Sequence, residues 1–216
     1  MKKITTTTII LSLFALTGTG LVALTHHLTK ERIEQQKLKS KLKILNSILP
    51  PSSYNNSLEK DVKKVRAERF LGTSNEVDVY RARFNGKPVA VVFETIALDG
   101  YNGKISILVA IKYNGSLAGI RIVAHQETPG LGDVIEQRKS DWSRRSFPGK
   151  AIGQPENDQW KVRKDGGVFD QFTGATITPR AVVKAVHLAL KYYTLNKAML
   201  FTQKLNSHNS YRYRGK

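Results

Sequence analysis

The first feature of the hydropathy pattern is an uncharged run of 22 residues from Ile4 to Thr25. As a helix this run would extend about 33 Å, close to the thickness of the hydrocarbon core of a bilayer. We therefore predict a short cytoplasmic start and an uncleaved transmembrane helix within residues 1–29. A cleaved signal peptide is the alternative, because Lys2 and Lys3 form a basic start, but no small-x-small cleavage site follows the run.

Leucines then recur at helical spacings of four, three and four, at positions 38, 42, 45 and 49. Pro50-Pro51 ends this pattern, and the polar segment after it is typical of a linker. We predict a helix from Lys30 to about Leu49 and assign residues 30–57 to a helical stalk and linker. Contact of this helix with a partner subunit is the alternative.

Four β-rich runs follow in two pairs, Val77–Phe84 with Val89–Thr95 and Ile105–Lys112 with Leu117–His125. An Asn-Gly dipeptide separates the members of each pair, and this is the strongest short-range signal of a hairpin. The two hairpins predict an antiparallel sheet.

The rest of the chain predicts shorter elements and one long helix. We expect a short helix over Asp133–Lys139, a short strand over Trp160–Val162, and a helix from Thr178 to about Leu195 with Thr178 as its N-cap. The fold class is therefore α+β, with one N-terminal transmembrane helix followed by a twisted antiparallel sheet packed with helices. We assign residues 58–200 to the folded domain and 201–216 to a basic C-terminal tail.

Composition limits the chemistry. The 216 residues include 35 Lys or Arg and 17 Asp or Glu, which gives a net charge of +18, and there is no Cys. The lack of Cys excludes disulfides, thiolate zinc sites and iron–sulfur clusters. The five His show no metal-ligand spacing, so we predict no metal site, and no catalytic residue pattern is present.

The positive charge is concentrated late in the chain, where residues 171–216 hold eight Lys or Arg and no Asp or Glu. Such a segment attracts nucleic acid, anionic lipid or an acidic protein, or is simply a solvated tail. No nucleic-acid recognition motif accompanies the charge, so nucleic acid is not an expected partner. A membrane-anchored basic binding or structural subunit without redox activity remains the alternative function.

The segment from Asp170 to Arg180 carries the strongest chemical signal, because a loop of Thr, Gly and Ala leads directly into a helix. Free backbone N–H groups and the helix dipole favour an anion there, and Arg180 would strengthen that preference. Gly174 and Ala175 leave room for a bulky group, and Thr173, Thr176 and Thr178 offer hydroxyls. Phosphate binding and an ordinary capped helix start both remain open on these residues alone.

Two further loops end or begin strands. His125–Asp133 contains Pro129, Gly130 and Gly132, which force an irregular loop of the kind that often carries function. Asp99–Gly103 is a turn just before a strand and is a weaker signal.

The order and spacing of these motifs resemble those of the FMN-binding G subunits of Rnf/Rsx ion-motive electron transport complexes. The flavin domain is also similar to that in the C subunits of sodium-translocating NADH:quinone reductases. The resemblance covers nearly the whole chain and rests on five matching segments, at residues 100–105, 125–133, 139–142, 164–167 and 170–176.

The resemblance implies a covalent cofactor. In the family, a separate flavin transferase links FMN through its phosphate to a Thr hydroxyl, which corresponds to Thr176 here. Asp170 is the first residue of the attachment motif, and Thr173, Gly174 and Ala175 precede the attachment point. The motif departs from the family at Gln171, where a small residue is frequent.

The family's second loop borders the isoalloxazine ring, which implies further cofactor-binding residues in this chain. They are Glu127, Thr128, Gly130 and Leu131, with Tyr101 as a weaker member of the set.

The implied function is an electron-carrier subunit rather than a stand-alone enzyme. The complex is implied to couple electron transfer of the ferredoxin/NAD type to ion translocation, or to keep a redox-sensing regulator reduced. Its partners would be the other subunits of the Rnf/Rsx membrane complex, the flavin transferase and the membrane.

The resemblance also implies a single-pass protein of the bacterial inner membrane with the flavin domain on the periplasmic side. The basic residues near the span predict the opposite, because six Lys or Arg between Lys30 and Lys43 would favour a cytoplasmic domain. The resemblance outweighs this count, since longer domains are translocated despite basic flanks.

Overall fold

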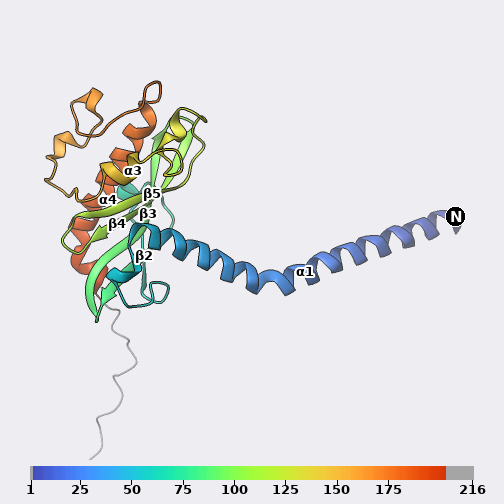
Figure 1. The fold of residues 1–216 in the computed structure, drawn as a ribbon. Coiled ribbons are helices and arrows are strands. Elements are labelled where there is room, and N and C mark those ends of the chain that lie inside the picture. Colours follow the sequence, from blue (N-terminus) through green and yellow to red (C-terminus); the bar gives the residue numbers. More distant parts are fainter. Residues whose placement is uncertain (1, 203–216) are drawn as a thin grey trace, which may run out of the picture. The chain divides into compact units, whose positions relative to one another are not determined.

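The structure is a computed structural model that describes residues 2–202 (Figure 1). The predicted basic tail, 201–216, lies outside the described residues from position 203 onward. The chain divides into two compact units between Ile44 and Leu45, and each is described by itself.

The first unit lies within helix α1, which runs from Lys2 to Ile48. Its segment Ile10–Lys30 is long and apolar enough to cross a membrane, and its large apolar side chains are exposed, with Phe14 at 77%. Exposed apolar side chains all around a helix suit a lipid environment. The membrane helix expected from the sequence is therefore present as a candidate span. The expected separate stalk helix is instead the C-terminal part of the same continuous helix.

The second unit is built on a five-stranded antiparallel sheet whose strands follow one another in sequence order (Figure 1). The strands are β1 (Val62–Val65), β2 (Val77–Phe84), β3 (Lys87–Gly100), β4 (Gly103–Lys112) and β5 (Leu117–Ala124). Both predicted hairpins are confirmed. At the first, Asn85 and Gly86 take the positive φ values of 50° and 76° that a tight two-residue turn requires.

Helix α4 (Ile177–Phe201) packs on one face of the sheet against β3 and β4. Residues on alternate strand positions, such as Val91, Phe93, Ile107 and Val109, are fully buried there. The α+β fold class is confirmed. The helix is longer than predicted because its apolar stripe continues to Phe201 beyond Leu195.

The opposite face of the sheet is buried as well, at the intervening positions Tyr80, Ala82, Val92 and Leu108. The residues buried outside the α4 core include two from the end of α1, Leu45 and Ile48, together with Leu49 just after the helix and Leu58 in the linker. Ile48 lies so close to β5 that a Cβ on Gly119 would be 3.1 Å from its Cγ2 atom. The end of α1 therefore belongs to this domain.

The remaining elements are short. Helices α2 (Glu68–Leu71) and α3 (Trp142–Ser146) join four 3-10 helices, η1 (Pro51–Ser53), η2 (Gly132–Ile135), η3 (Asn157–Gln159) and η4 (Arg163–Asp165). The predicted helix over Asp133–Lys139 is only the 3-10 turn η2. The predicted strand over Trp160–Val162 is only one bridge, between Val162 and Phe169. After η2 the backbone forms a turn in which Lys139 and Ser140 donate to the carbonyl of Glu136, and Val162 pairs with Phe169 alone.

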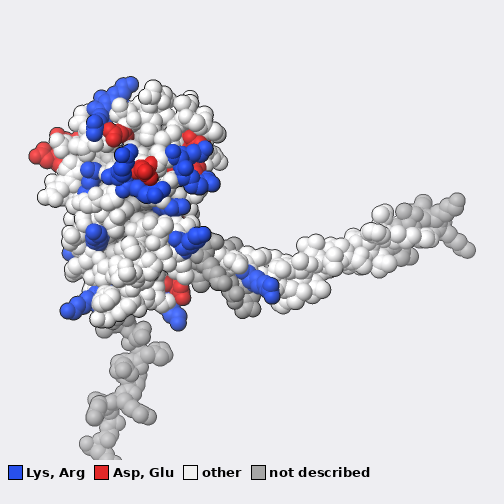
Figure 2. Space-filling view, viewed as in Figure 1, with Lys and Arg blue, Asp and Glu red and all other residues white. Residues whose placement is uncertain are grey.

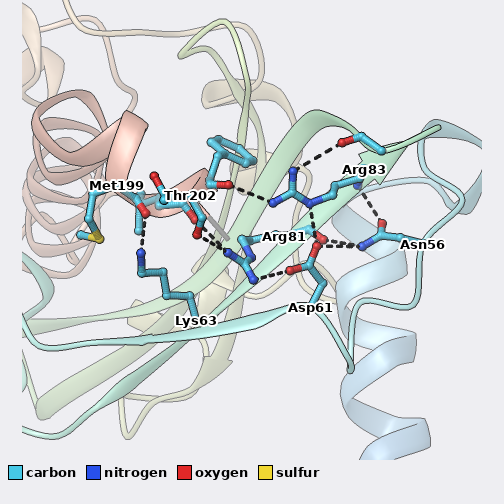
Figure 3. Close-up of polar contacts among 10 residues, drawn as sticks. Asn56, Asp61, Lys63, Arg81, Arg83, Met199 and Thr202 are labelled. Carbon is cyan, nitrogen blue, oxygen red and sulfur yellow. Dashed lines mark hydrogen bonds and ion pairs between the residues drawn. The ribbon is translucent and has the colours of Figure 1, made fainter. Parts of the chain in front are cut away.

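A buried charge cluster fixes the C-terminal end of α4 (Figure 3). Asp61 pairs with Arg81 at 2.5 Å and with Arg83 at 2.7 Å. The two guanidinium groups also donate to backbone carbonyls of the last turn, at Phe201 and Thr202. Cations are favourable at this end of a helix because its last carbonyls have no partner within the helix.

Candidate functional site

A cavity of about 260 Å³ lies at the N-terminal end of α4. Three segments distant in sequence form it: the β3–β4 turn, the loop between β5 and η2, and the loop that enters α4. Its lining residues are Tyr101, Glu127, Thr128, Leu131, Gly132, Gly174, Ala175, Thr176, Ile177 and Thr178.

The structure brings together seven of the ten residues that the sequence singled out, from Tyr101 through the 127–131 loop to Thr176. Three others lie away from the cavity wall, because Gly130 and Thr173 are exposed to solvent and the exposed carboxylate of Asp170 pairs with Arg163 at 2.9 Å.

The loop before α4 turns sharply. Ala175 donates its N–H to the carbonyl of Phe172 at 3.1 Å, and Gly174 adopts a φ of 78°, which only glycine takes without strain. This turn brings the half-buried Thr176 to the cavity wall at the helix N-terminus.

Thr176 occupies the N-cap position of α4, and its side chain makes no capping hydrogen bond. The helix begins at Ile177, so Thr178 is in the first turn rather than at the predicted N-cap position. The Thr178 hydroxyl instead donates to the Glu127 carboxylate. Thr176 therefore lines the cavity without using its side chain as a cap.

The loop after β5 is held by its own polar contacts. Three consecutive N–H groups, from Leu131 to Asp133, point to the carbonyl of Thr128, and the Asp133 carboxylate accepts from the N–H of Gly130 at 2.8 Å. These bonds give the Pro129–Gly132 loop a defined shape. Leu131 is left on the cavity rim with 44% of its surface exposed.

The His125 ring fixes the start of the same loop. Its Nδ1 accepts the N–H of Glu127 at 3.1 Å, so its Nε2 carries the proton and faces the Glu136 carboxylate at 2.8 Å. Hydrogen bonds from Arg138 and then from His125 hold the pKa of the Glu136 carboxyl below its ordinary value.

The charge around the cavity differs from the sequence expectation. Arg180 forms a two-point ion pair with Asp165, at 2.6 and 2.8 Å, and lowers the pKa of that carboxyl, so Arg180 is not directed at the helix N-terminus. Glu127 is the charged residue of the cavity wall, and no Lys or Arg lines it among the described residues. Figure 2 shows basic side chains beside acidic ones on the surface of the domain.

The residues present fit a phosphate-linked aromatic cofactor. The N-terminus of α4 favours an anion, Gly174 and Ala175 leave space beside Thr176, and a ring would pack on the exposed apolar rim of Tyr101, Leu131 and Ile177. The cavity is smaller than the roughly 300–1,000 Å³ typical of ligand pockets, so part of such a group would lie on this rim.

The sequence placed Gly132 in a motif and offered the Thr178 hydroxyl at the candidate phosphate site, but neither residue, nor Ile177, was among the predicted cofactor-binding residues. Thr178 was interpreted as the N-cap because Pro179 follows it, whereas the N-cap is Thr176, two residues earlier. Among the part of the chain that the structure describes, no group of three or more His, Asp or Glu side chains could hold a metal ion.

The comparisons with known proteins agree with this geometry. The family model of the FMN-binding domain matches residues 100–191, which include all three segments of the cavity, and that of the RnfG N-terminal region matches residues 1–48.

Curated proteins named as the G subunit of an ion-translocating oxidoreductase complex are similar along nearly the whole chain. The protein from Vibrio atlanticus is 50% identical over 92% of this chain and 94% of its own length. The protein from Shewanella oneidensis is 48% identical over 92% of this chain and 93% of its own length. The protein from Vibrio cholerae is 49% identical over 90% of this chain and 92% of its own length.

Proposed function

Because the chain belongs to the family of ion-translocating oxidoreductase complex G subunits, we propose that it carries electrons within such a membrane complex through an FMN bound in the cavity at the start of α4. The observation that carries the proposal is the position of Thr176. This half-buried residue lines the cavity, its side chain makes no capping hydrogen bond, and it lies at the helix end that favours a phosphate.

In this proposal the cofactor is covalent. The Thr176 oxygen forms a bond to the phosphorus of an FMN unit, and the hydroxyl proton is lost to the transferase or to solvent. Ester formation from free FMN is unfavourable in water, so the donor is an activated flavin dinucleotide whose P–O bond to AMP breaks. No oxidation or reduction accompanies this step, and a separate flavin transferase catalyses it.

The bound flavin would supply one-electron redox chemistry, and the chain supplies its position and electrostatics. Thr176 and the first turn of α4 would hold the phosphate, with Gly174 and Ala175 giving it space. Tyr101, Leu131 and Ile177 would contact the ring at the cavity rim. The carboxylate of Glu127 near the ring would disfavour an anionic reduced flavin and lower its reduction potential, the reverse of what a basic site would do.

We further propose that the partners are the other subunits of the complex and that the domain is on the periplasmic side of the bacterial inner membrane. The candidate span Ile10–Lys30 and the names of the relatives support a membrane complex. The coupled reaction would be of the ferredoxin/NAD type, or would serve to keep a regulator reduced.

The test is Thr176→Ala in the full chain, expressed with the flavin transferase and purified in detergent. We expect the denatured band of the wild type to fluoresce under ultraviolet light and the variant band to be dark. Intact mass should show the addition of one FMN less one water to the wild type alone. Thr194→Ala is the matched control, because it removes another hydroxyl from α4, one that donates to the carbonyl of Leu190. Fluorescence that persists in Thr176→Ala would place the attachment on another residue.

A further inference from the structure

Glu127 is buried to an extent unusual for a carboxylate, with 4% of its surface exposed. Both of its oxygens have partners on other segments. Oε1 accepts the backbone N–H of Asn102, in the β3–β4 turn, at 3.1 Å, and Oε2 accepts the hydroxyl of Thr178, in the first turn of α4. The Thr178 side chain is also buried, at 1% exposure. One carboxylate therefore ties together all three segments that form the cavity.

The backbone of two glycines packs closely against this carboxylate. A Cβ on Gly132 would lie 2.8 Å from the Cβ and Oε2 of Glu127 and from the Oγ1 of Thr178. A Cβ on Gly100 would lie 2.9 Å from Oε1 of Glu127 and 2.2 Å from the carbonyl oxygen of Gly103. Contacts this short are not tolerated, so backbone packs directly on both sides of the carboxylate. Gly132 is explained by the position of Glu127 and Thr178 without any cofactor, whereas Gly100 is required first by the carbonyl of Gly103 and then by Glu127.

The backbone of Glu127 is fixed too. Its N–H donates to Nδ1 of His125, whose other nitrogen is held by Glu136, and the neighbouring Thr128 accepts the side-chain amide of Asn102 at 3.0 Å. Hydrogen bonds within the protein therefore hold the carboxylate in place without any ligand.

From this geometry we propose that Glu127 is a positioning residue that acts through Thr178 and Asn102. It fixes the first turn of α4 against the β3–β4 turn, so that the Thr176 hydroxyl, two residues from Thr178, is presented at the cavity wall for flavin attachment. This role rests on the proposed function of Thr176. This positioning role is distinct from a contact with the flavin ring, because both carboxylate oxygens already accept hydrogen bonds from the protein.

The test uses the unmodified full chain in detergent and two readouts, amide hydrogen exchange and the rate of flavin transfer by the transferase at saturating flavin dinucleotide. In Glu127→Ala we expect faster exchange both at Asn102 and at Arg180, whose N–H donates to the carbonyl of Thr176 in the first turn of α4. In Thr178→Val we expect faster exchange in α4 while the Asn102 amide stays protected, because Glu127 still accepts it.

Flavin transfer at saturation should fall by about tenfold or more in both variants, as expected for the loss of a hydrogen bond to a charged group. Thr178→Ser keeps the hydroxyl and should restore the rate to within about twofold of the wild type, which a loss of packing alone would not allow. Gly132→Ala separates the Glu127 and Thr178 side chains without removing a polar group, and should reproduce the effect of Thr178→Val.

Glu94→Ala is the matched control. Its exposed carboxylate also accepts a hydroxyl, from Ser106, but on the sheet surface outside the cavity lining, so exchange near the cavity and flavin transfer should not change. Wild-type exchange and transfer rates in Thr178→Val and Gly132→Ala would overturn the proposal even if Glu127→Ala failed to fold. If the wild type itself accepted no flavin, the function proposed for Thr176 would fail, and the exchange pattern would still decide whether Glu127 anchors the two turns.

Discussion

The indole N–H of Trp142 donates a hydrogen bond of 2.9 Å to the backbone carbonyl of Asp170. This contact joins helix α3 to the first residue of the loop that ends at Thr176. The Trp142 ring also packs against Phe147 and Phe172, with ring centroids 5.3 Å away in each case. The buried Trp142 therefore holds the start of the attachment loop in place, although it does not line the cavity.

Trp142→Phe should lower the free energy of unfolding by about 1–3 kcal/mol, since the Asp170 carbonyl loses its partner, and should also slow flavin transfer to Thr176. Urea unfolding followed by circular dichroism measures the first effect. Trp160→Phe is the control, because the buried Nε1 of Trp160 has no hydrogen-bond partner within residues 2–202. Flavin transfer as fast in Trp142→Phe as in the control would contradict the supporting role.

Asp61→Asn should destabilise the domain by about 2 kcal/mol. The change leaves Arg81 and Arg83, whose side chains are 11% exposed, without a charge partner. The loss is below the 3–5 kcal/mol typical of a fully buried pair because Asp61 is 22% exposed.

Glu76→Gln serves as the comparison for the Asp61 variant, because Glu76 forms an exposed ion pair with Arg66 at 3.6 Å. Its cost should stay under about 1 kcal/mol and should shrink further in high salt. Equal losses in the two variants, measured by urea unfolding, would show that the Asp61 cluster does not secure the end of α4.

His187 should make stability depend on pH. Burial, followed by the charge of Lys191, lowers the pKa of His187 to about 4, and its ring stacks on Trp160 with centroids 4.9 Å apart. The unfolded chain therefore binds a proton near pH 6.5 that the folded chain does not. The contribution is fully present above about pH 6.5 and is lost as the pH falls toward about 4.

The slope from this one group is at most about 1.4 kcal/mol per pH unit. His187→Gln should flatten the stability curve between about pH 4 and 6.5, measured by urea unfolding at a series of pH values. If the free energy of unfolding depended on pH as steeply in this variant as in the wild type, groups other than His187 would cause the loss of stability in acid.

The hairpins could be predicted because their signals are local. Asn85-Gly86 needs only its own backbone preferences to define a turn, and the continuous apolar run in β4 indicates a strand that is buried on both faces. Strand β1 could not be predicted in the same way. Its four residues include two lysines, and its pairing with β2 depends on the neighbouring strand rather than on its own pattern.

The same distinction applies to the site. The Gly-Ala-Thr loop before α4 is a local signal, which indicates a candidate anion site with three hydroxyls, and the family resemblance then singles out Thr176 as the predicted attachment point. The bond from Thr178 to Glu127 joins residues 51 positions apart and appears only when the sheet has brought the two loops together. The pairing of Arg180 with Asp165 spans 15 positions and also depends on the fold, and it removes the positive charge that sequence alone assigned to the helix start.

Helix α4 has the cavity at its first turn and the Asp61 cluster at its last. With 25 residues it extends about 37 Å. An affinity tag or a fluorescent reporter inserted directly after Thr202, at the end of α4, would therefore begin about 37 Å from Thr176. Labelled protein could thus be immobilised by one end of this helix while the other remains accessible to the transferase and to redox partners.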